Sequence, residues 1–173
     1  MSRRPPEQVP PGPDENPDRE ADPREVARTI ALRQLTMAPR TRKQLAEKLA
    51  AKEVPAEIVV EVLDRFEEVG LVDDRAFAES FVHARRSGRG RRALAQELRR
   101  KGVDDETAAD ALEVVDHDSQ AEAARELVRR KLRSTAGLER AVRERRLFGL
   151  LARRGFPTDV VLRVVREELD GQA

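Results

Sequence analysis

Apolar residues recur along this chain at helical spacing, and one arrangement of them occurs three times. The first copy is Leu45, Leu49, Lys52, Val54 and Leu63, the second is Leu94, Leu98, Lys101, Val103 and Leu112, and the third is Leu147, Leu151, Arg154, Phe156 and Val165. The second copy is offset by 49 residues from the first, and the third by a further 53. A period of this size is typical of stacked supersecondary units. The pattern predicts an all-α fold of three tandem three-helix repeats that form an elongated, curved array, with neighbouring repeats covering apolar faces that one unit is too small to bury.

The first repeat is expected over residues 22–70. Asp22-Pro23-Arg24-Glu25 predicts an N-cap, a proline at the first helical position and a glutamate that reaches back to the cap. Pro39 ends this helix, and Thr41 with Gln44 predicts a second capping box. The third helix carries the apolar positions of residues 58–66 and stops at Gly70.

The second repeat is expected over residues 71–116 and the third over residues 117–173. Asp73 or Asp74 begins the second repeat, glycines 88 and 90 break its first helix, and Asp104 or Asp105 caps its third. Ser119 and Glu122 predict the capping box that begins the third repeat. A loop at 134–137 separates its first helix from its second, and Gly155 and Pro157 separate the second from the third.

Each repeat also has an apolar residue just before its third helix and another five residues later. The pairs are Val54 and Val59, Val103 and Ala108, and Phe156 and Val161. This is the spacing of a hydrophobic staple, which fixes the angle at which the chain enters a helix. Three copies of one entry angle indicate three copies of one tertiary unit.

Composition narrows the class of protein further. Seven of the ten prolines fall within the first 23 residues, which hold almost nothing to bury, so residues 1–21 are expected to form a disordered tail. Cysteine, tyrosine and tryptophan are absent, and the core is left to leucine, valine, alanine and five phenylalanines. No apolar run approaches the ~20 residues that span a bilayer. We expect a soluble cytoplasmic protein with no membrane contact.

Charge alternates in sign along the chain although the net charge is only +1. Segment 40–52 has five basic residues and one acidic, whereas segment 53–79 has nine acidic and two basic. Segment 85–101 has eight basic and one acidic, segment 103–123 has eight acidic and none basic, and segment 125–154 has eleven basic and three acidic. Two interpretations stand with equal weight: the basic segments form a stripe on the surface, or acidic and basic helices neutralise one another across repeats.

No constellation of catalytic residues is present. His83 and His117 have no metal-ligand spacing, and Gly88-Arg89-Gly90 precedes a basic helix instead of following an apolar strand. The pairs Asp73-Asp74 and Asp104-Asp105 are better explained as helix caps than as cation ligands. The sequence predicts a protein that is not an enzyme and that uses no metal and no cofactor.

The basic segments are therefore the candidate partner-binding residues, for an acidic protein surface or for phosphates. They are Arg40, Arg42, Lys43, Arg85, Arg86, Arg89, Arg91, Arg92, Arg99, Arg100, Lys101, Arg129, Arg130 and Lys131. Basic residues at a helix C-terminus also favour the helix dipole, which is an equally good explanation of Arg99, Arg100 and Lys101. The phenylalanines fall at apolar helical positions, which argues against an aromatic platform for single strands.

Several stretches resemble the RecX family, regulators of the RecA recombinase. They are residues 31–35, 40–49, 63–66, 70–74 and 77–82 with Arg85, residues 96–98 leading to Gly102, and residues 151–156. The resemblance spans about residues 24–169, and its most specific part is residues 70–102. This chain departs from the family in its proline-rich tail and in Arg91-Arg92-Ala93, where relatives often carry a bulkier apolar residue.

The resemblance implies three tandem three-helix repeats and a regulator that binds the RecA–DNA filament, usually inhibiting ATP hydrolysis and strand exchange. Two other hypotheses stay open: a helical DNA-binding module that contacts phosphates through its basic helices, and a helical scaffold for another acidic partner. The filament contains DNA, so contacts with RecA and with DNA are compatible. We expect the chain to act as a monomer.

Overall fold

The computed structural model describes residues 22–171, and the predicted disordered tail lies outside this range. Nine helices and no strand occur within it. They are α1 (Pro23–Met37), α2 (Arg42–Ala50), α3 (Ala56–Glu68), α4 (Asp74–Arg85), α5 (Arg91–Lys101), α6 (Asp105–Ala111), α7 (His117–Arg133), α8 (Arg140–Arg153) and α9 (Thr158–Asp170). The predicted all-α class is confirmed.

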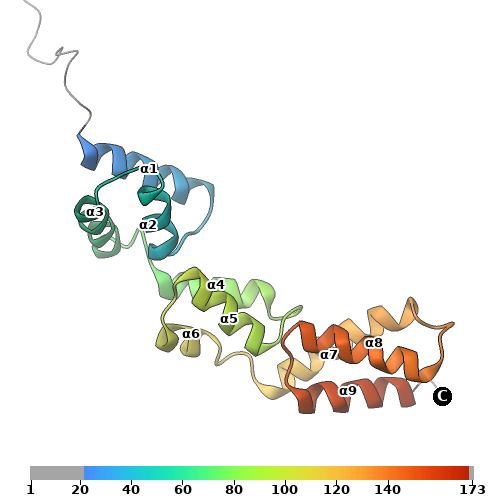
Figure 1. Cartoon of the computed structure of the whole chain (residues 1–173). Helices are drawn as coiled ribbons and strands as arrows, with labels where there is room; N and C mark the ends of the chain where they lie inside the picture. The colour runs from blue at the N-terminus through green and yellow to red at the C-terminus, as the bar shows by residue number, and fades with distance from the viewer. Residues whose placement is uncertain (1–21, 172–173) are drawn as a thin grey trace, which may run out of the picture.

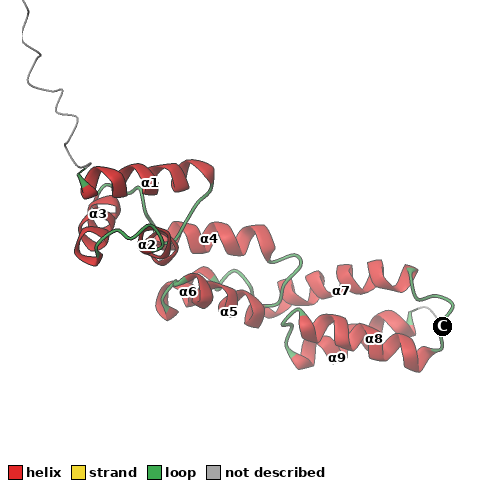
Figure 2. Cartoon of the chain, turned by 45° about the horizontal axis from the view of Figure 1, so that its top comes forward, coloured by secondary structure: helices red, strands yellow, loops and turns green. Residues whose placement is uncertain are grey.

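The helices form three consecutive three-helix units, which we call the first unit (α1–α3), the second unit (α4–α6) and the third unit (α7–α9). In each unit all three helices pack against one another, and every strong helix–helix contact lies within one unit. The units follow one another in an elongated row, with α1 and α9 at opposite ends (Figure 1). Figure 2 shows the same row from another side, so the predicted elongated array is confirmed.

The apolar core is divided into three clusters, one inside each unit. The repeated leucine pairs are the centres of these clusters: all six are completely buried, namely Leu45, Leu49, Leu94, Leu98, Leu147 and Leu151. The staple residues before the third helices also join their own unit's cluster. The expectation that neighbouring units cover each other's apolar faces is therefore wrong, because three packed helices close each core by themselves.

Helix caps follow the sequence in most places. Thr41 and Gln44 form the predicted reciprocal capping box, and the side chains of Asp73 and Asp104 accept hydrogen bonds from the backbone at the starts of α4 and α6. Asp22 caps α1 as expected, but Glu25 does not reach back to it, because its carboxylate pairs with Arg28 at 2.7 Å.

The predicted capping box at Ser119 is wrong. The N-cap of α7 is Asp116, three residues earlier, and its carboxylate accepts a hydrogen bond from the Ser119 backbone N–H at 2.8 Å. Asp116 is as good a cap as serine, and the earlier start adds nearly one turn of helix. The added turn carries His117, which contacts the start of α9.

The first and second units meet end to end. The start of α2 faces the end of α5, where the Thr41 hydroxyl donates to the Lys101 carbonyl at 2.5 Å. The backbone N–H of Arg42 donates to the Asp74 carboxylate of α4 at 2.8 Å. The N-terminus of α2, with its positive dipole end, thus meets a helix C-terminus and a carboxylate, which are both favourable neighbours.

The second and third units repeat this end-to-end joint 49 residues later. The Gly90 N–H donates to the Arg154 carbonyl at the end of α8 at 2.8 Å, and the Arg91 N–H donates to the Gln120 side chain of α7 at 3.1 Å. The backbones approach so closely that a Cβ atom on Gly90 would lie 2.2 Å from the Gly155 carbonyl oxygen. Ala93, the small residue noted above, lies against Gly155. Both joints therefore combine hydrogen bonds to backbone groups with close contacts at glycines.

Among the helices of residues 22–171, none has both the length and the apolar character that crossing a membrane would require.

Candidate partner-binding surface

The 14 predicted partner-binding cations separate into two groups according to whether other groups of the chain hold them. Arg42 belongs to the held group. It lies only partly exposed at the start of α2, and its guanidinium bonds to Asp64 at 2.6 Å and to Glu67 at 2.5 Å on α3. Partial burial acts to lower the pKa of Arg42, but these two carboxylates outweigh it and the pKa is raised. Arg42 therefore ties α2 to α3 within the first unit.

The cluster at residues 85–92 is also divided. Arg85 and Arg89 share the carboxylate of Glu97, at 3.7 and 3.6 Å. Arg91 donates to the carbonyl of Leu112 and, at 3.4 Å, to that of Val115, so it satisfies backbone groups in the segment that follows α6. These contacts make three of the five arginines structural.

Three further cations are held by carboxylates in their own unit. Lys43 lies 4.0 Å from Glu47, Arg99 bonds to Asp105 at 2.6 Å, and Arg129 bonds to Glu168 at 2.8 Å. The hydrogen bond from Arg129 to Glu168 raises the arginine pKa. All ion pairs found between residues 22 and 171 join residues of the same unit. Acidic and basic segments thus neutralise each other, but within repeats and not across them.

The remaining predicted cations have no carboxylate within 4.0 Å among the described residues. They are Arg40, Arg86, Arg92, Arg100, Lys101, Arg130 and Lys131. Arg86, Arg92, Arg100 and Arg130 are exposed, whereas Arg40 and Lys101 are half-buried. Cations that no carboxylate neutralises remain available to a partner, so these seven are the better candidates.

One groove between the first and second units combines such cations with aromatic rings. Its lining includes Arg40, Phe77, Phe81, Arg85 and Lys101. The two rings are stacked with their centres 6.0 Å apart, the Arg85 guanidinium lies 4.5 Å from the centre of the Phe81 ring, and the Lys101 ammonium lies 5.4 Å from it. The Nε atom of Arg40 is buried there without a hydrogen-bond partner. Cations above ring faces are held in place by cation–π attraction, so this groove presents positive charge beside apolar surface.

Four arginines on and after α8 were not among the predicted partner-binding residues. Arg145, Arg146, Arg153 and Arg154 line a second groove together with Lys131 of α7. They were counted in the basic segment 125–154 but were not selected. The signal was available, because positions 146, 150 and 153 fall on one face of a helix, as do 145, 149 and 153.

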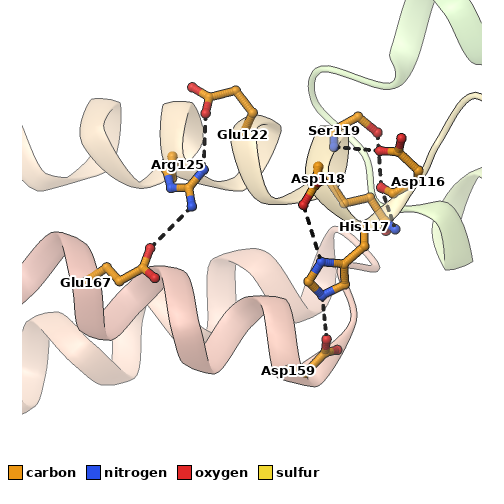
Figure 3. Close-up of polar contacts among 9 residues, drawn as sticks. Asp116, His117, Asp118, Ser119, Glu122, Arg125, Asp159 and Glu167 are labelled. Carbon is orange, nitrogen blue, oxygen red and sulfur yellow. Dashed lines mark hydrogen bonds and ion pairs between the residues drawn. The ribbon is translucent and has the colours of Figure 1, made fainter.

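Polar contacts also connect the helices of the third unit, as Figure 3 shows. Nε2 of His117 lies 2.8 Å from the Asp159 carboxylate at the start of α9, and Arg125 pairs with both Glu122 of α7 and Glu167 of α9. The hydrogen bond with His117 lowers the pKa of Asp159. These residues pair α7 with α9, which is a structural role, and within residues 22–171 no group of three or more potential ligands is placed to hold a metal ion.

Comparison with protein families assigns each unit separately. The family model described as RecX, first three-helix domain, matches residues 27–66. The model of the second three-helix domain matches residues 73–112, and that of the third matches residues 118–165. The three matches occur in order, one in each unit of the structure.

Similar proteins match this chain over most of its length and most of their own. The regulatory protein RecX of Streptomyces coelicolor is 54% identical over 151 residues, which cover 86% of this chain and 80% of the relative. That of Thermobifida fusca is 51% identical over 148 residues, covering 84% and 80%. That of Mycobacterium sp. strain KMS is 45% identical over 169 residues, covering 94% and 90%.

Two solved structures have a similar fold. The crystal structure of RecX from Lactobacillus salivarius has a TM-score of 0.75 at 24% identity, covering 86% of this chain and 97% of that one. A crystal structure described as regulatory protein RecX has a TM-score of 0.76 at 28% identity, covering 83% and 73%. The end-to-end row of three units is therefore an arrangement that solved structures share.

Proposed function

The chain belongs to the RecX family of regulatory proteins, and from this premise we propose that it binds the RecA–DNA filament and inhibits its ATP hydrolysis and strand exchange. The observation that carries the proposal is the succession of all three RecX domains along one continuous row of helices. A filament repeats the same surface at regular intervals, and an elongated body can contact more than one repeat of it.

The construction of the row supports this role. Each unit has its own apolar core, so the exterior of the row is left for binding. The joints fix the units relative to one another through a hydrogen bond between backbone groups and further hydrogen bonds between backbone and side-chain groups. Units fixed in this way add their contacts without a further loss of freedom for each one, which strengthens binding to a repeating surface.

We assign the contact to the cations that no carboxylate of the chain holds, with Arg86 and Arg92 of the second unit foremost. Both are exposed, and both belong to the middle one of the three units. Arginine is favoured at protein interfaces because its planar fork pairs with carboxylates in a fixed geometry. The proposal includes action as a monomer, in the cytoplasm and without a cofactor, with repeat boundaries at 22–70, 71–116 and 117–173.

The test is RecA-dependent hydrolysis of ATP on single-stranded DNA, measured while the protein is titrated from far below the RecA concentration. We expect inhibition at substoichiometric protein, because each bound molecule acts on a filament of many subunits. At that concentration the protein covers little DNA, so simple competition for DNA does not explain the loss. Unchanged hydrolysis across the whole titration would refute the proposal.

A matched pair of variants tests the assigned surface. The double substitution Arg86→Ala with Arg92→Ala removes two cations without carboxylate partners, and we expect it to need about tenfold more protein for half inhibition, an effect of the size typical for loss of interface arginines. The control is Arg28→Ala with Arg65→Ala, which removes the same charge from exposed arginines that pair with Glu25 and Glu68. Equal inhibition by the two variants would refute the assignment of the surface and leave the function to be judged by the titration.

A further inference from the structure

The groove between α7 and α8 gathers an unusual concentration of positive charge. Five of its seven lining residues are cationic and none is acidic: Lys131, Arg145, Arg146, Arg153 and Arg154, with Gly149 and Leu150 completing the lining. Its volume is about 630 Å³, and it opens to solvent. Like charges this close repel one another, so the grouping is unfavourable until a counter-charge enters.

No carboxylate of the described chain supplies that counter-charge. Lys131, Arg145, Arg146 and Arg153 have no ion pair among residues 22–171, and Arg154 donates only to the backbone carbonyl of Gly88 at 3.2 Å. The carboxylates of the same unit that pair with arginines bind elsewhere: Glu122 of α7 and Glu167 of α9 hold Arg125, Glu168 holds Arg129 and Asp170 holds Arg140. The third unit therefore neutralises the cations that face α9 and leaves the groove uncompensated.

The floor of the groove contains a glycine in the interior of a helix. Gly149 lies in the second half of α8, where glycine is the poorest helix former apart from proline. A Cβ atom at this position would come within 2.9 Å of the Arg153 guanidinium. The absence of a side chain leaves room for the arginine head group and for whatever it binds.

The composition of the wall indicates the kind of anion. Four of the five cations are arginines, whose fork of N–H groups matches the paired oxygens of a phosphate. The cations extend along α8 from residue 145 to residue 154, about 14 Å at the helical rise, which suits a series of phosphates better than a single ion. No aromatic ring lines the groove, so bases have nothing on which to stack.

We infer that the α7–α8 groove of the third unit binds the phosphate backbone of a nucleic acid, without reading its bases. This inference deepens the proposed function, because the filament proposed as the partner contains DNA, and it assigns the DNA contact to the third unit. The surface around Arg86 and Arg92 is left for the protein partner. The two contacts lie in different units of the row and are separable by mutation.

The experiment measures fluorescence anisotropy of a short labelled oligonucleotide titrated with the full chain, without RecA, over a series of salt concentrations. The triple variant Arg145→Ala, Arg146→Ala, Arg153→Ala is expected to bind at least about tenfold more weakly at low salt. The slope of log binding constant against log salt concentration should also be shallower by about two for this variant, since each lost phosphate contact reduces that slope by about 0.7. The wild type should bind oligothymidylate and an oligonucleotide of mixed sequence with similar affinity.

The control is Arg33→Ala, Arg163→Ala, Arg166→Ala, which removes the same charge from exposed arginines outside the groove and should bind like the wild type. A second variant, Gly149→Gln, keeps every cation, improves helix propensity and fills the floor, so it should weaken binding even if the triple variant folds poorly. Retained affinity in Gly149→Gln and in a folded triple variant, or equal losses in the triple variant and the control, would overturn the inference.

Two other outcomes would also overturn it: no salt-dependent binding of any oligonucleotide, or stronger binding to polyglutamate or to anionic lipid vesicles than to DNA. The result is independent of the test of the proposed function. If the groove binds DNA while RecA hydrolysis is unaffected, the proposed function fails and the groove assignment stands. If RecA is inhibited and the groove binds no DNA, the groove assignment fails and the proposed function stands.

Discussion

Gly90→Ala should separate the second unit from the third without unfolding either. Gly90 caps α5 with an ordinary negative φ of −74°, so its backbone conformation does not require glycine. The lack of space does require glycine, because an added Cβ would lie 2.2, 2.3 and 2.4 Å from three backbone atoms, Gly155 O, Gly155 C and Phe156 N. Real Cβ contacts are never this short, and a backbone cannot swing aside as a side chain can, so the joint must open.

The size of the effect follows from the hydrogen bonds that cross the joint. Three are lost when it opens: Gly90 N–H to Arg154 O at 2.8 Å, Arg91 N–H to Gln120 Oε1 at 3.1 Å, and Arg154 Nη1–H to Gly88 O at 3.2 Å. At a net 0.5–1.5 kcal/mol for each bond, the joint contributes roughly 1.5–4.5 kcal/mol. Gly90 belongs to none of the three apolar clusters, so the cores should keep their stability.

The assay is native-state hydrogen exchange, supported by small-angle X-ray scattering. Protection of the amides of residues 90 and 91 should fall by about ten- to a thousandfold, because each 1.4 kcal/mol is a factor of ten. Amides in the interior of α5 and α7 should exchange as in the wild type, and the scattering should show a more variable overall shape. Helical content should not change.

Two matched variants separate the clash from other effects of the substitution. Gly88→Ala places a Cβ no closer than 3.7 Å to any neighbouring atom and should behave like the wild type. Gly90→Ser introduces the same clash with a residue that is favoured at an N-cap, so it should open the joint as alanine does. Wild-type protection of residues 90 and 91 in Gly90→Ala, or equal behaviour of the alanine variants at 88 and 90, would refute the reasoning.

Three further predictions concern the cores and the first joint. Leu151→Ala, at a fully buried position, should destabilise the third unit by about 2–5 kcal/mol, and a melting temperature equal to that of the wild type would contradict this. Thr41→Ala removes both the cap of α2 and the hydrogen bond to the Lys101 carbonyl, so it should lower the free energy of unfolding by about 1–3 kcal/mol, measured by chemical denaturation. A decrease of less than about 0.5 kcal/mol would show that the joint between the first and second units does not stabilise the protein in this way. Burial raises the pKa of Asp74 above its usual 3.8, although the Arg42 N–H opposes the shift, so its contribution to stability is fully present below that value and declines as the pH rises through the folded-state pKa. Asp74→Asn keeps the acceptor oxygen, so its stability relative to the wild type should increase from acid to neutral pH; a difference independent of pH would exclude this.

The repeat and most caps were predictable because they depend on residues close together in sequence. Leu45 and Leu49 share a helix face at any tertiary arrangement, and Thr41 needs only Gln44 to form its capping box. Ser119 misled because Asp116 competes for the same helix start, and local rules rank the two caps as equals. The sequence did not predict that each unit encloses its own core, because the repeat period does not show how much apolar surface three short helices can cover.

The candidate surface was only partly predictable for a different reason. Whether a cation is free depends on which carboxylate faces it, and the deciding pairs join distant residues, as Arg42 joins Asp64 and Arg129 joins Glu168. Arg91 is held by backbone carbonyls, which no charge count reveals. The arginines of α8 were visible as a helical face but became a candidate site only when the fold placed Lys131 beside them.

The central claim is that three rigidly joined units act on the RecA filament as one body. The most direct measurement is RecA-dependent ATP hydrolysis titrated with three proteins: the wild type, Gly88→Ala and Gly90→Ala. The claim predicts inhibition by the wild type and by Gly88→Ala at substoichiometric concentration, and much weaker inhibition by Gly90→Ala, whose units remain folded but lose their fixed arrangement. Equal inhibition by all three proteins, or inhibition by none of them, would contradict it.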